Sequence, residues 1–293
     1  RGLHERNEAI VFVSGSSSKL LGKEFGTVLT GRHLDVVVFP FSFRELLEIN
    51  KINPADKLEI LSKKITVKQL LRDYVAFGGL PLVVISKEKE ILAKYFDDII
   101  LHDIAERHGI QKIDKLRVLA KYYLTNVGTP SSFRKISEFI GVSLDSVERF
   151  TEFFKEAYLI ASINFFSFSL KEQEVNPKKI YSLDLGLRNV ISFRFLDDLG
   201  KLYENLVFIE LFKSENEIYY FKKKGECDFI VKKGSKIIDA IQVCFTLTKE
   251  NKKREVNGLL DALNEFNLPH GLVITDDFEA KEVHGNKTIF FTP

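Results

Sequence analysis

Apolar residues follow two different periods along this chain, and the period indicates where strands and helices lie. Near the N-terminus, the continuous apolar runs Ile10–Val13 and Leu34–Phe39 predict two buried strands. Lys19–Leu29 between them has the apolar spacing of a helix. Strands that are apolar on both faces are typical of a parallel sheet covered by helices. Two strands do not form such a sheet alone, so we expect further strands upstream of Arg1.

The residues from about 46 to 112 are predicted to form an all-α region. A helical pattern ends near Asn50, and the more polar stretch Lys51–Ile65 indicates a linker. Thr66 is a suitable N-cap for a helix over Val67–Phe77, which stops at a Gly-Gly-Leu-Pro sequence. Lys87–His108 then has the pattern of a long amphipathic helix.

Residues 113–170 show the order of a winged helix, with three helices followed by strand-like residues. The predicted segments are Leu116–Val127, Ser131–Ile140, a third helix capped by Ser143, and the wing Tyr158–Leu170. In a DNA reader the third helix would enter the major groove. The acidic residues of that helix outnumber its basic ones, and an acidic helix is repelled by phosphates. We therefore expect a packing or protein-contact role, with DNA reading as the alternative.

The C-terminal part has the order α-β-β-β-α-β. The predicted elements are a helix over Leu199–Ser214, strands over Glu217–Lys223, Cys227–Lys232 and Lys236–Leu247, a helix over Lys252–Phe266 and a strand over Gly271–Thr275. Thr288–Phe291 is a candidate last strand. This order is the core of the restriction-endonuclease-like fold.

That fold uses a helix Glu, then an Asp, then an (Asp/Glu)-x-Lys pair on the next strand. Glu204 and Asp228 match the first two positions, whereas Gln242 and Cys244 stand in the acid and Lys places. The chemistry needs several oxygens that hold Mg²⁺ against the scissile phosphate, and Gln242 offers only a neutral one. We predict a degenerate catalytic site of Glu204, Asp228 and Gln242, with Mg²⁺ or Mn²⁺ held by Asp228 and Glu204. The alternative for Asp228 is a structural ion pair, and for Cys244 a small buried side chain.

Basic residues surround this predicted site. The candidate nucleic-acid contacts are Lys222, Lys223, Lys224, Lys252, Lys253 and Arg254. Lysines at strand edges also prevent aggregation without binding a ligand, so both interpretations stay open.

One further constellation has metal-ligand spacing. Asp98, His102 and Glu106 recur every four residues on the predicted long helix and therefore share one face. An ion-paired, solvated face is the commoner meaning of such a pattern. The sequence contains no HExxH, GxGxxG or GxxxxGK[ST] motif.

Composition and charge exclude some classes of protein. The chain has 293 residues, 45% of them hydrophobic, and a formal net charge of +2, which excludes a strongly basic nucleic-acid coat. No apolar run is long enough for a membrane span. With two cysteines and no leader-like start, we expect a cytoplasmic protein without disulfides. There is no Met, even at position 1, so we also expect a fragment of a longer chain.

Several stretches together resemble one family. They are VFVSGSSSKLLGKE, LTGRHLDVVVFPFSFRELL, FGGLPLVV, YFDDIILHDI and YENLVFIEL followed by YYFKKKGECDFIV and AIQV. These resemble the archaeal AAA-type (STAND-like) ATPases that carry a winged helix and a C-terminal PD-(D/E)xK endonuclease-like domain of unknown function. The resemblance covers essentially the whole chain, but the Walker A loop and Walker B strand of complete members are missing.

The resemblance implies an α/β fold with an all-α middle. The expected parts are residues 1–45 from the C-terminal part of an ATPase core, 46–112 as a helical lid, 113–170 as the winged helix, and 171–293 as the endonuclease-like domain. Ser14 or Ser16 would be a nucleotide sensor and Arg32 a phosphate-sensing residue. ATP and Mg²⁺ would be cofactors of the complete protein.

The resemblance leaves three functions open. The preferred one is a DNA-associated ATPase fragment whose nuclease-like domain binds rather than cleaves. The alternatives are an active structure-specific nuclease with a displaced Lys, and a regulatory scaffold that contacts a partner protein through the winged helix.

Overall fold

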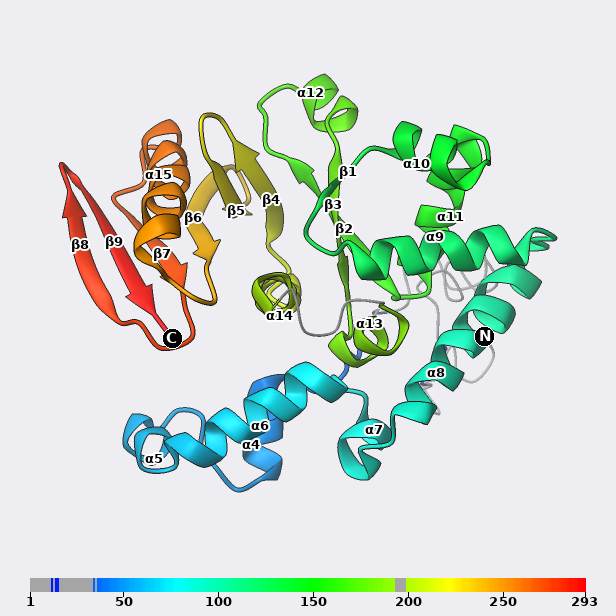
Figure 1. Cartoon of the computed structure of the whole chain (residues 1–293), viewed down its shortest axis with the longest axis horizontal. Coiled ribbons are helices and arrows are strands. Elements are labelled where there is room, and N and C mark those ends of the chain that lie inside the picture. Colours follow the sequence, from blue (N-terminus) through cyan, green and yellow to red (C-terminus); the bar gives the residue numbers. More distant parts are fainter. Residues whose placement is uncertain (1–11, 13, 16–33, 35, 193–198) are drawn as a thin grey trace, which may run out of the picture.

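The computed structural model describes residues 12, 14–15, 34, 36–192 and 199–293. Its centre is a mixed sheet with the strand order β1-β3-β2-β4-β5-β6-β7-β9-β8 (Figure 1). The strands are β1 (Pro130–Ser131), β2 (Ile160–Phe165), β3 (Lys178–Ser182), β4 (Glu217–Lys222), β5 (Glu226–Lys233), β6 (Lys236–Val243), β7 (His270–Ile274), β8 (Ala280–His284) and β9 (Lys287–Thr292). The α/β class is therefore confirmed.

The C-terminal order α-β-β-β-α-β is also confirmed. Helix α14 (Leu199–Phe212) precedes β4, and α15 (Lys249–Glu265) connects β6 to its parallel neighbour β7. Thr248 and Asn251 form a capping box at the start of α15. The apolar residues of α14 and α15 fall into two separate buried clusters, each of which also contains residues of β5 and β6. Strand β8, which pairs with β9 at the sheet edge, was not predicted.

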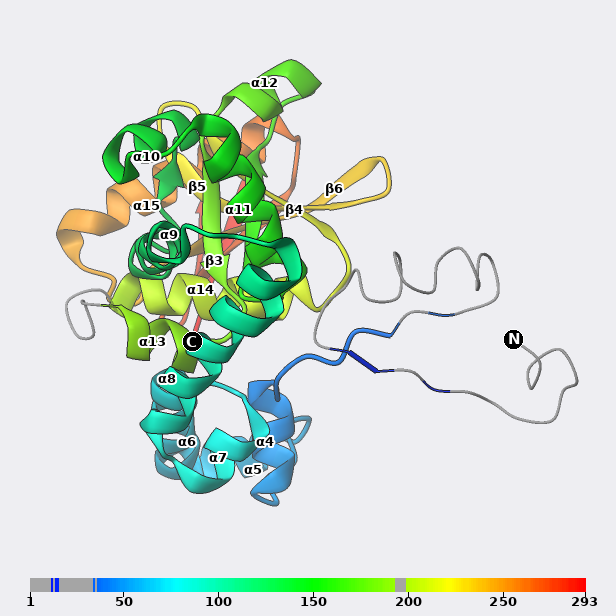
Figure 2. The same cartoon turned by 90° about the vertical axis from the view of Figure 1, so that its right-hand side faces the viewer.

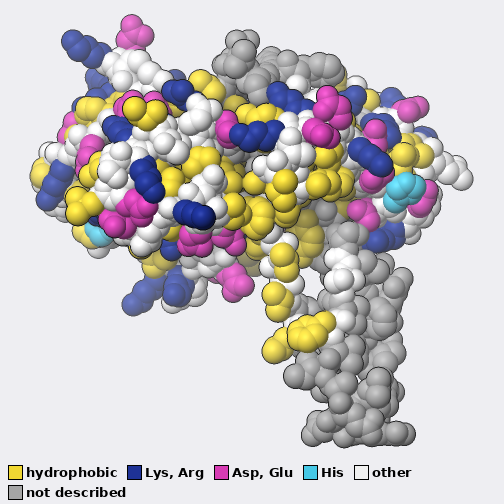
Figure 3. Space-filling model, turned by 90° about the horizontal axis from the view of Figure 1, so that it is seen from below, with side chains coloured by type: hydrophobic (Ala, Val, Ile, Leu, Met, Phe, Trp, Pro, Cys, Tyr) yellow, Lys and Arg dark blue, Asp and Glu magenta, His cyan; other side chains and the backbone are white. Residues whose placement is uncertain are grey.

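Helices dominate the chain before β2. They are α4 (Phe43–Ile49), α5 (Lys57–Ser62), α6 (Lys64–Phe77), α7 (Pro81–Ser86), α8 (Lys89–Asp98), the π-helical η1 (Ile99–Glu106), α9 (Ile113–Thr125), α10 (Phe133–Ile140) and α11 (Leu144–Glu156). In Figures 1 and 2, α4–α7 lie at the end of the molecule opposite to the short helix α12 (Leu170–Val175). On the coloured part of the face that Figure 3 shows, hydrophobic side chains gather towards the middle, and charged side chains are scattered around them.

Three local predictions are wrong. The segment Leu34–Phe39 is no buried strand where the structure describes it, because Val36 and Val38 are exposed and irregular. Lys51–Ile65 is not a linker, since it contains α5 and the start of α6. Thr66 is not the N-cap of α6, which begins at Lys64. Asp56, whose carboxylate accepts from the backbone N–H groups of Leu58 and Glu59, begins α5 instead.

The helical region joins the sheet region through a tight junction at Gly78 and Gly79. Asp184 caps α13 (Leu185–Ile191), and its carboxylate accepts hydrogen bonds from Leu187 N at 2.9 Å and Gly79 N at 2.8 Å. A Cβ on Gly78 would lie 2.3 Å from an Asp184 carboxylate oxygen, and Gly78 also has a positive φ of 77°. The glycines after Phe77 therefore both end α6 and admit the cap of α13.

Residues 113–182 form the helices α9–α12, the short strand β1 and the antiparallel pair β2–β3. Ser143 is the N-cap of α11, and the apolar face of that helix is buried as expected. The expected boundary between residues 170 and 171 lies inside the β2–β3 hairpin. Strand β2 also pairs in parallel with β4, so the sheet is continuous from the hairpin into the C-terminal α/β unit.

Candidate nuclease-like centre

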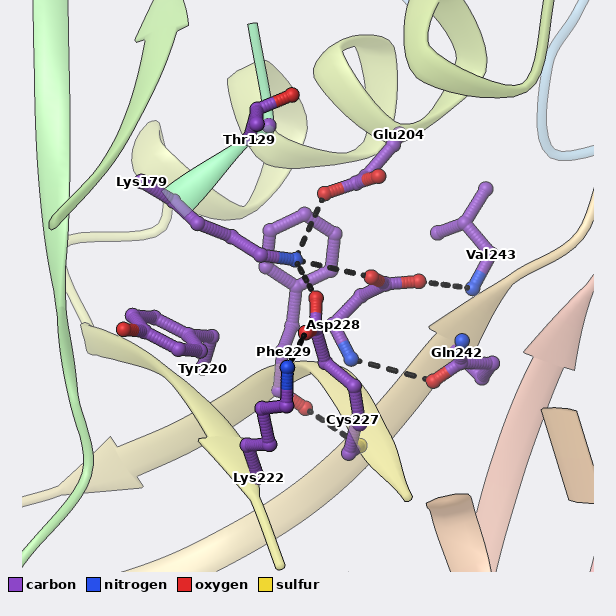
Figure 4. Close-up of polar contacts among 12 residues, drawn as sticks. Thr129, Lys179, Glu204, Tyr220, Lys222, Cys227, Asp228, Phe229, Gln242 and Val243 are labelled. Atoms are coloured by element: carbon purple, nitrogen blue, oxygen red, sulfur yellow. Dashed lines mark hydrogen bonds and ion pairs between the residues drawn. The ribbon is translucent and has the colours of Figure 1, made fainter. Parts of the chain in front are cut away.

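The structure brings the three predicted site residues together. Asp228 lies near the start of β5, Gln242 near the end of β6, and Glu204 on α14, and all three side chains are buried. Asp228 N donates to Gln242 Oε1 at 3.2 Å, and Val243 N donates to Asp228 Oδ2 at 3.1 Å. The first bond holds the Asp228 backbone against the Gln242 side chain, and the second holds the Asp228 side chain against the backbone of β6 (Figure 4).

A lysine that sequence reasoning missed lies at the middle of this group. Lys179 on β3 is fully buried, and its Nζ lies 3.1 Å from Glu204 Oε1, 3.1 Å from Asp228 Oδ1 and 2.9 Å from Glu226 Oε1 (Figure 4). The lysines that the sequence offers for the displaced position, Lys222, Lys224 and Lys252, are those close in sequence to Asp228 or Gln242. Lys179 reaches the site because β3 pairs with β2 and β2 pairs with β4. No local motif marks it.

Further donors complete the surroundings of the carboxylates. Tyr181 Oη donates to Glu204 Oε1 at 2.7 Å, and Lys201 Nζ contacts Glu204 Oε2 at 2.6 Å. On the other side, Gln242 Nε2 donates to Glu255 Oε2 at 2.6 Å. Gln242 thus joins a carboxylate on α15 to the backbone of Asp228, a role that its sequence pattern did not reveal.

We call Lys179, Glu204, Glu226, Asp228 and Glu255 the carboxylate centre. Both oxygens of every carboxylate in it lie next to a donor from the protein. The remaining contacts are Lys222 Nζ to Glu226 Oε2 at 3.7 Å and the Arg254 guanidinium to Glu255 Oε1. Within residues 36–192 and 199–293 no cluster of His, Cys, Asp and Glu has an arrangement suited to a metal ion.

Burial and charge shift the titration of this centre. Burial, together with the Glu204 charge, raises the pKa of Asp228 to about 6. Burial also acts to raise the pKa of Glu204, but Lys179 and Lys201 bring it below its ordinary value. For Lys179, burial opposes the charged form, yet Tyr181 and the carboxylates raise its pKa well above the ordinary value. The ammonium therefore stays protonated at neutral pH.

A pocket of about 610 Å³ opens on the exposed side of the centre. It is lined by Leu199, Gly200, Lys201, Glu204, Glu226, Asp228, Gln242, Val243, Cys244, Phe245, Thr246, Asn251, Arg254 and Glu255. Lys179 is no part of this lining, so the carboxylates separate its ammonium from the pocket.

Cys244 supplies no positive charge to the site. It is buried, its Sγ lies 3.4 Å from Thr246 O, and burial raises its pKa to about 11. Cys244 and Cys227 are both free thiols, as a protein without disulfides requires.

The predicted basic residues divide into two groups. Lys222, Lys223 and Lys224 are exposed at the β4–β5 turn, and Lys252, Lys253 and Arg254 lie in the first turns of α15. Four of the six contact carboxylates: Lys222 with Glu226, Lys223 with Glu265, Lys252 with Glu282 and Arg254 with Glu255. Their role towards nucleic acid stays a prediction.

The remaining predicted sites receive less support from the structure. His102 Nδ1 lies 3.0 Å from Glu106 Oε2 on an exposed helix face, which fits the ion-paired alternative to a metal site with Asp98. Ser14 is exposed and irregular, whereas Ser16 and Arg32 lie outside the described residues. The nucleotide-sensing role stays a prediction.

Three family models match successive parts of the chain. Residues 1–47 match an AAA domain, residues 68–197 match a domain of unknown function (DUF8612), and residues 199–292 match another domain of unknown function (DUF4143). The last range contains Glu204, Asp228 and Gln242, whereas Lys179 lies in the preceding one. The N-terminal match supports an ATPase-associated protein of the AAA class.

Two relatives extend across most of the chain. An uncharacterized protein of Methanocaldococcus jannaschii is 33% identical over 272 residues, which cover 88% of this chain and 60% of that protein. An uncharacterized protein of Haemophilus influenzae is 27% identical over 290 residues, which cover 96% of this chain and 69% of that protein. No solved structure matches the chain. Among the described helices, none combines the length and the apolar character that crossing a bilayer requires.

Proposed function

We propose that this chain is part of an AAA-class ATPase whose C-terminal α/β unit is a nuclease-like domain that binds DNA rather than cleaving it. The AAA match at residues 1–47 supports the ATPase class. The α-β-β-β-α-β order and the convergence of Glu204, Asp228 and Gln242 support the nuclease-like unit. DNA association is inferred from the exposed lysines at the β4–β5 turn.

The carboxylate centre carries the part of the proposal that concerns cleavage. Mg²⁺ needs oxygen ligands in a near-octahedral arrangement. Here Glu204 and Asp228 already bind the Lys179 ammonium, and their other oxygens accept from Lys201 and Val243 N. A divalent ion would have to displace these donors and approach a buried positive charge. The residues therefore do not fit a metal, and we assign no metal-dependent step to them.

A nuclease assay tests this proposal. DNA substrates that include duplexes, flaps and single strands are incubated with the chain in Mg²⁺ or Mn²⁺. We compare the wild type, Asp228→Asn and the double variant Gln242→Glu/Cys244→Lys. We expect DNA binding without cleavage by the wild type. Wild-type cleavage that Asp228→Asn abolishes would contradict the proposal, and absence of any DNA binding would favour a protein-contact scaffold.

Lys179 also supports one alternative function, an active nuclease with a displaced lysine. Its Nζ lies 3.1 Å from Asp228 Oδ1, so an ammonium lies next to the predicted site although Cys244 has none. Lys179→Arg distinguishes the two functions. An active nuclease would keep part of its cleavage with the charge retained, whereas a binding domain shows no cleavage in either protein.

The nucleotide is a separate part of the proposal. The 293-residue sequence has no GxxxxGK[ST] phosphate loop. We expect no ATP turnover by this chain alone, with ATP and Mg²⁺ as cofactors of the complete protein. Turnover by the purified chain that Arg32→Ala abolishes would contradict this expectation.

A further inference from the structure

A second, smaller pocket lies at the end of the sheet where the β2–β3 connection meets the β4–β5 turn. Its volume is about 230 Å³, and five phenylalanines line it: Phe165, Phe166, Phe168, Phe221 and Phe266. Lys222 and Lys223 form part of its rim. We call this pocket the aromatic groove.

The phenylalanines form a connected set of ring contacts. Phe166 is buried at the centre, with its ring centroid 5.2 Å from that of Phe168 and 4.9 Å from that of Phe266. Phe221 packs on Phe266 at 5.1 Å. Phe168 is 85% exposed, although it contacts Phe166 edge-on. The Phe168 ring thus contacts the buried Phe166 while most of its surface is open to a ligand.

The rim of the groove carries mixed charges, because Glu172 and Glu265 line it together with Lys222 and Lys223. The side chains of Lys222 and Lys223 are 61% and 60% exposed, and Lys224 follows them. Lys223 pairs with Glu265 at 2.8 Å, but solvent weakens an exposed pair of this kind. A phosphate can therefore replace the carboxylate as the partner of Lys223 at little cost.

We propose that the aromatic groove binds an unpaired nucleotide of single-stranded DNA, with the base stacked on Phe168 and the adjacent phosphates near Lys222 and Lys223. Proteins that bind single strands combine aromatic stacking surfaces with a positively charged path for the backbone. A paired base inside a duplex has no open face to offer. The small volume of the groove fits one ring rather than a larger ligand.

The groove also adjoins the carboxylate centre. Lys222 lines the groove and contacts Glu226, which in turn contacts Lys179. Single-stranded DNA held here would lie beside the nuclease-like pocket. The inference rests on the proposed DNA association and specifies the kind of DNA.

Phe168→Ala tests the stacking contact. Binding of a labelled oligothymidylate is measured by fluorescence anisotropy, and a duplex of the same length is measured in parallel. Stacking on an aromatic ring typically contributes about 1–3 kcal/mol per base, so we expect about 5- to 150-fold weaker single-strand binding and unchanged duplex binding. Phe139→Ala, which removes another exposed phenylalanine on α10, is the matched control and should change neither.

Phe168→Trp adds a direct readout, since the chain contains no other Trp. We expect oligothymidylate to quench the Trp emission. Two results together would overturn the inference but keep the proposed function. They are DNA binding that Phe168→Ala leaves unchanged, for duplex and single strand alike, and the absence of quenching in Phe168→Trp. Absence of all DNA binding would overturn both. If the Trp emission of Phe168→Trp instead shifts to the blue as protein concentration rises, the groove binds a second copy of the chain, and the inference is overturned.

Discussion

Two buried carboxylates in this protein are stabilised in different ways. Asp184 accepts hydrogen bonds from backbone N–H groups at the start of α13 and at Gly79. Asp228 contacts a lysine that two other carboxylates share. Burial raises the pKa of both groups above their ordinary values. Asp184 joins two parts of the fold, whereas Asp228 belongs to a charged network beside an open pocket.

The difference between Asp184 and Asp228 shows that a cluster of buried carboxylates needs a positive charge as well as hydrogen-bond donors. Backbone donors solvate one carboxylate and leave nothing exchangeable, which suits a structural cap. A cluster of carboxylates needs an added cation, and an active nuclease takes a metal ion for that purpose. In this chain the cation is the Lys179 ammonium, which is covalently attached and fully buried. The centre is thus built like a catalytic site but neutralised like a structural one.

Removal of Lys179 gives the largest expected effect. Lys179→Met leaves Glu204, Glu226 and Asp228 without their shared cation, and a broken buried ion pair typically costs about 3–5 kcal/mol. Chemical denaturation should show this loss in the free energy of unfolding. Lys178→Met is the control, because Lys178 pairs with the exposed Glu174. Equal stabilities of the two variants would show that the centre is not held by Lys179.

The pH dependence of stability separates Asp228 from its neighbours. The native pKa of about 6 exceeds the ordinary Asp value of about 3.9, so the native state binds more protons between these values. Its contribution to stability therefore falls as pH rises from about 4 to about 6. Relative to the wild type, Asp228→Asn should gain about 2–3 kcal/mol over this range. Asp145→Asn, on the exposed surface of α11, should follow the wild-type profile. A parallel profile for Asp228→Asn would contradict the shifted pKa.

Removal of Asp184 should lower the free energy of unfolding by less than removal of Lys179 does. Asp184→Ala removes the cap of α13 and leaves Gly79 N–H buried without its partner, for which we expect about 2 kcal/mol of destabilisation. Asp56→Ala removes an exposed cap from α5 and should cost about 1 kcal/mol or less. Thermal or chemical denaturation measures both. A larger loss from Asp56→Ala would show that the junction with Gly79 adds nothing to the cap.

Glu226 is the test with the smallest expected effect. Its side chain is 29% exposed, compared with 5% for Glu204, and water therefore weakens its pairing with Lys179. We expect Glu226→Gln to cost about 1 kcal/mol or less, and Glu204→Gln to cost more. The reverse order in denaturation experiments would mean that Lys179 is anchored from the exposed side of the centre.

Local pattern was sufficient for much of the fold. The helix α14, the strands β4–β6 and the cap of α11 by Ser143 follow from apolar spacing and capping chemistry. The same rules failed at Leu34–Phe39, whose apolar run carries the signal of a buried strand while nothing in the described residues covers Val36 or Val38. An apolar run indicates that a segment needs burial, but it does not supply the partner.

The candidate site likewise has a part that the sequence predicted and a part that it did not. The sequence by itself determined that Glu204 and Asp228 stand at the acidic positions of a nuclease-like pattern and that Gln242 and Cys244 replace the remaining ones. Only the tertiary structure decided which cation meets these acids. Lys179 comes from β3, which precedes the predicted α-β-β-β-α-β elements in the chain, and it reaches Asp228 because the sheet continues from β3 through β2 and β4 to β5. Strand pairing between distant segments is set by packing of the whole sheet, so no spacing along the chain encodes it.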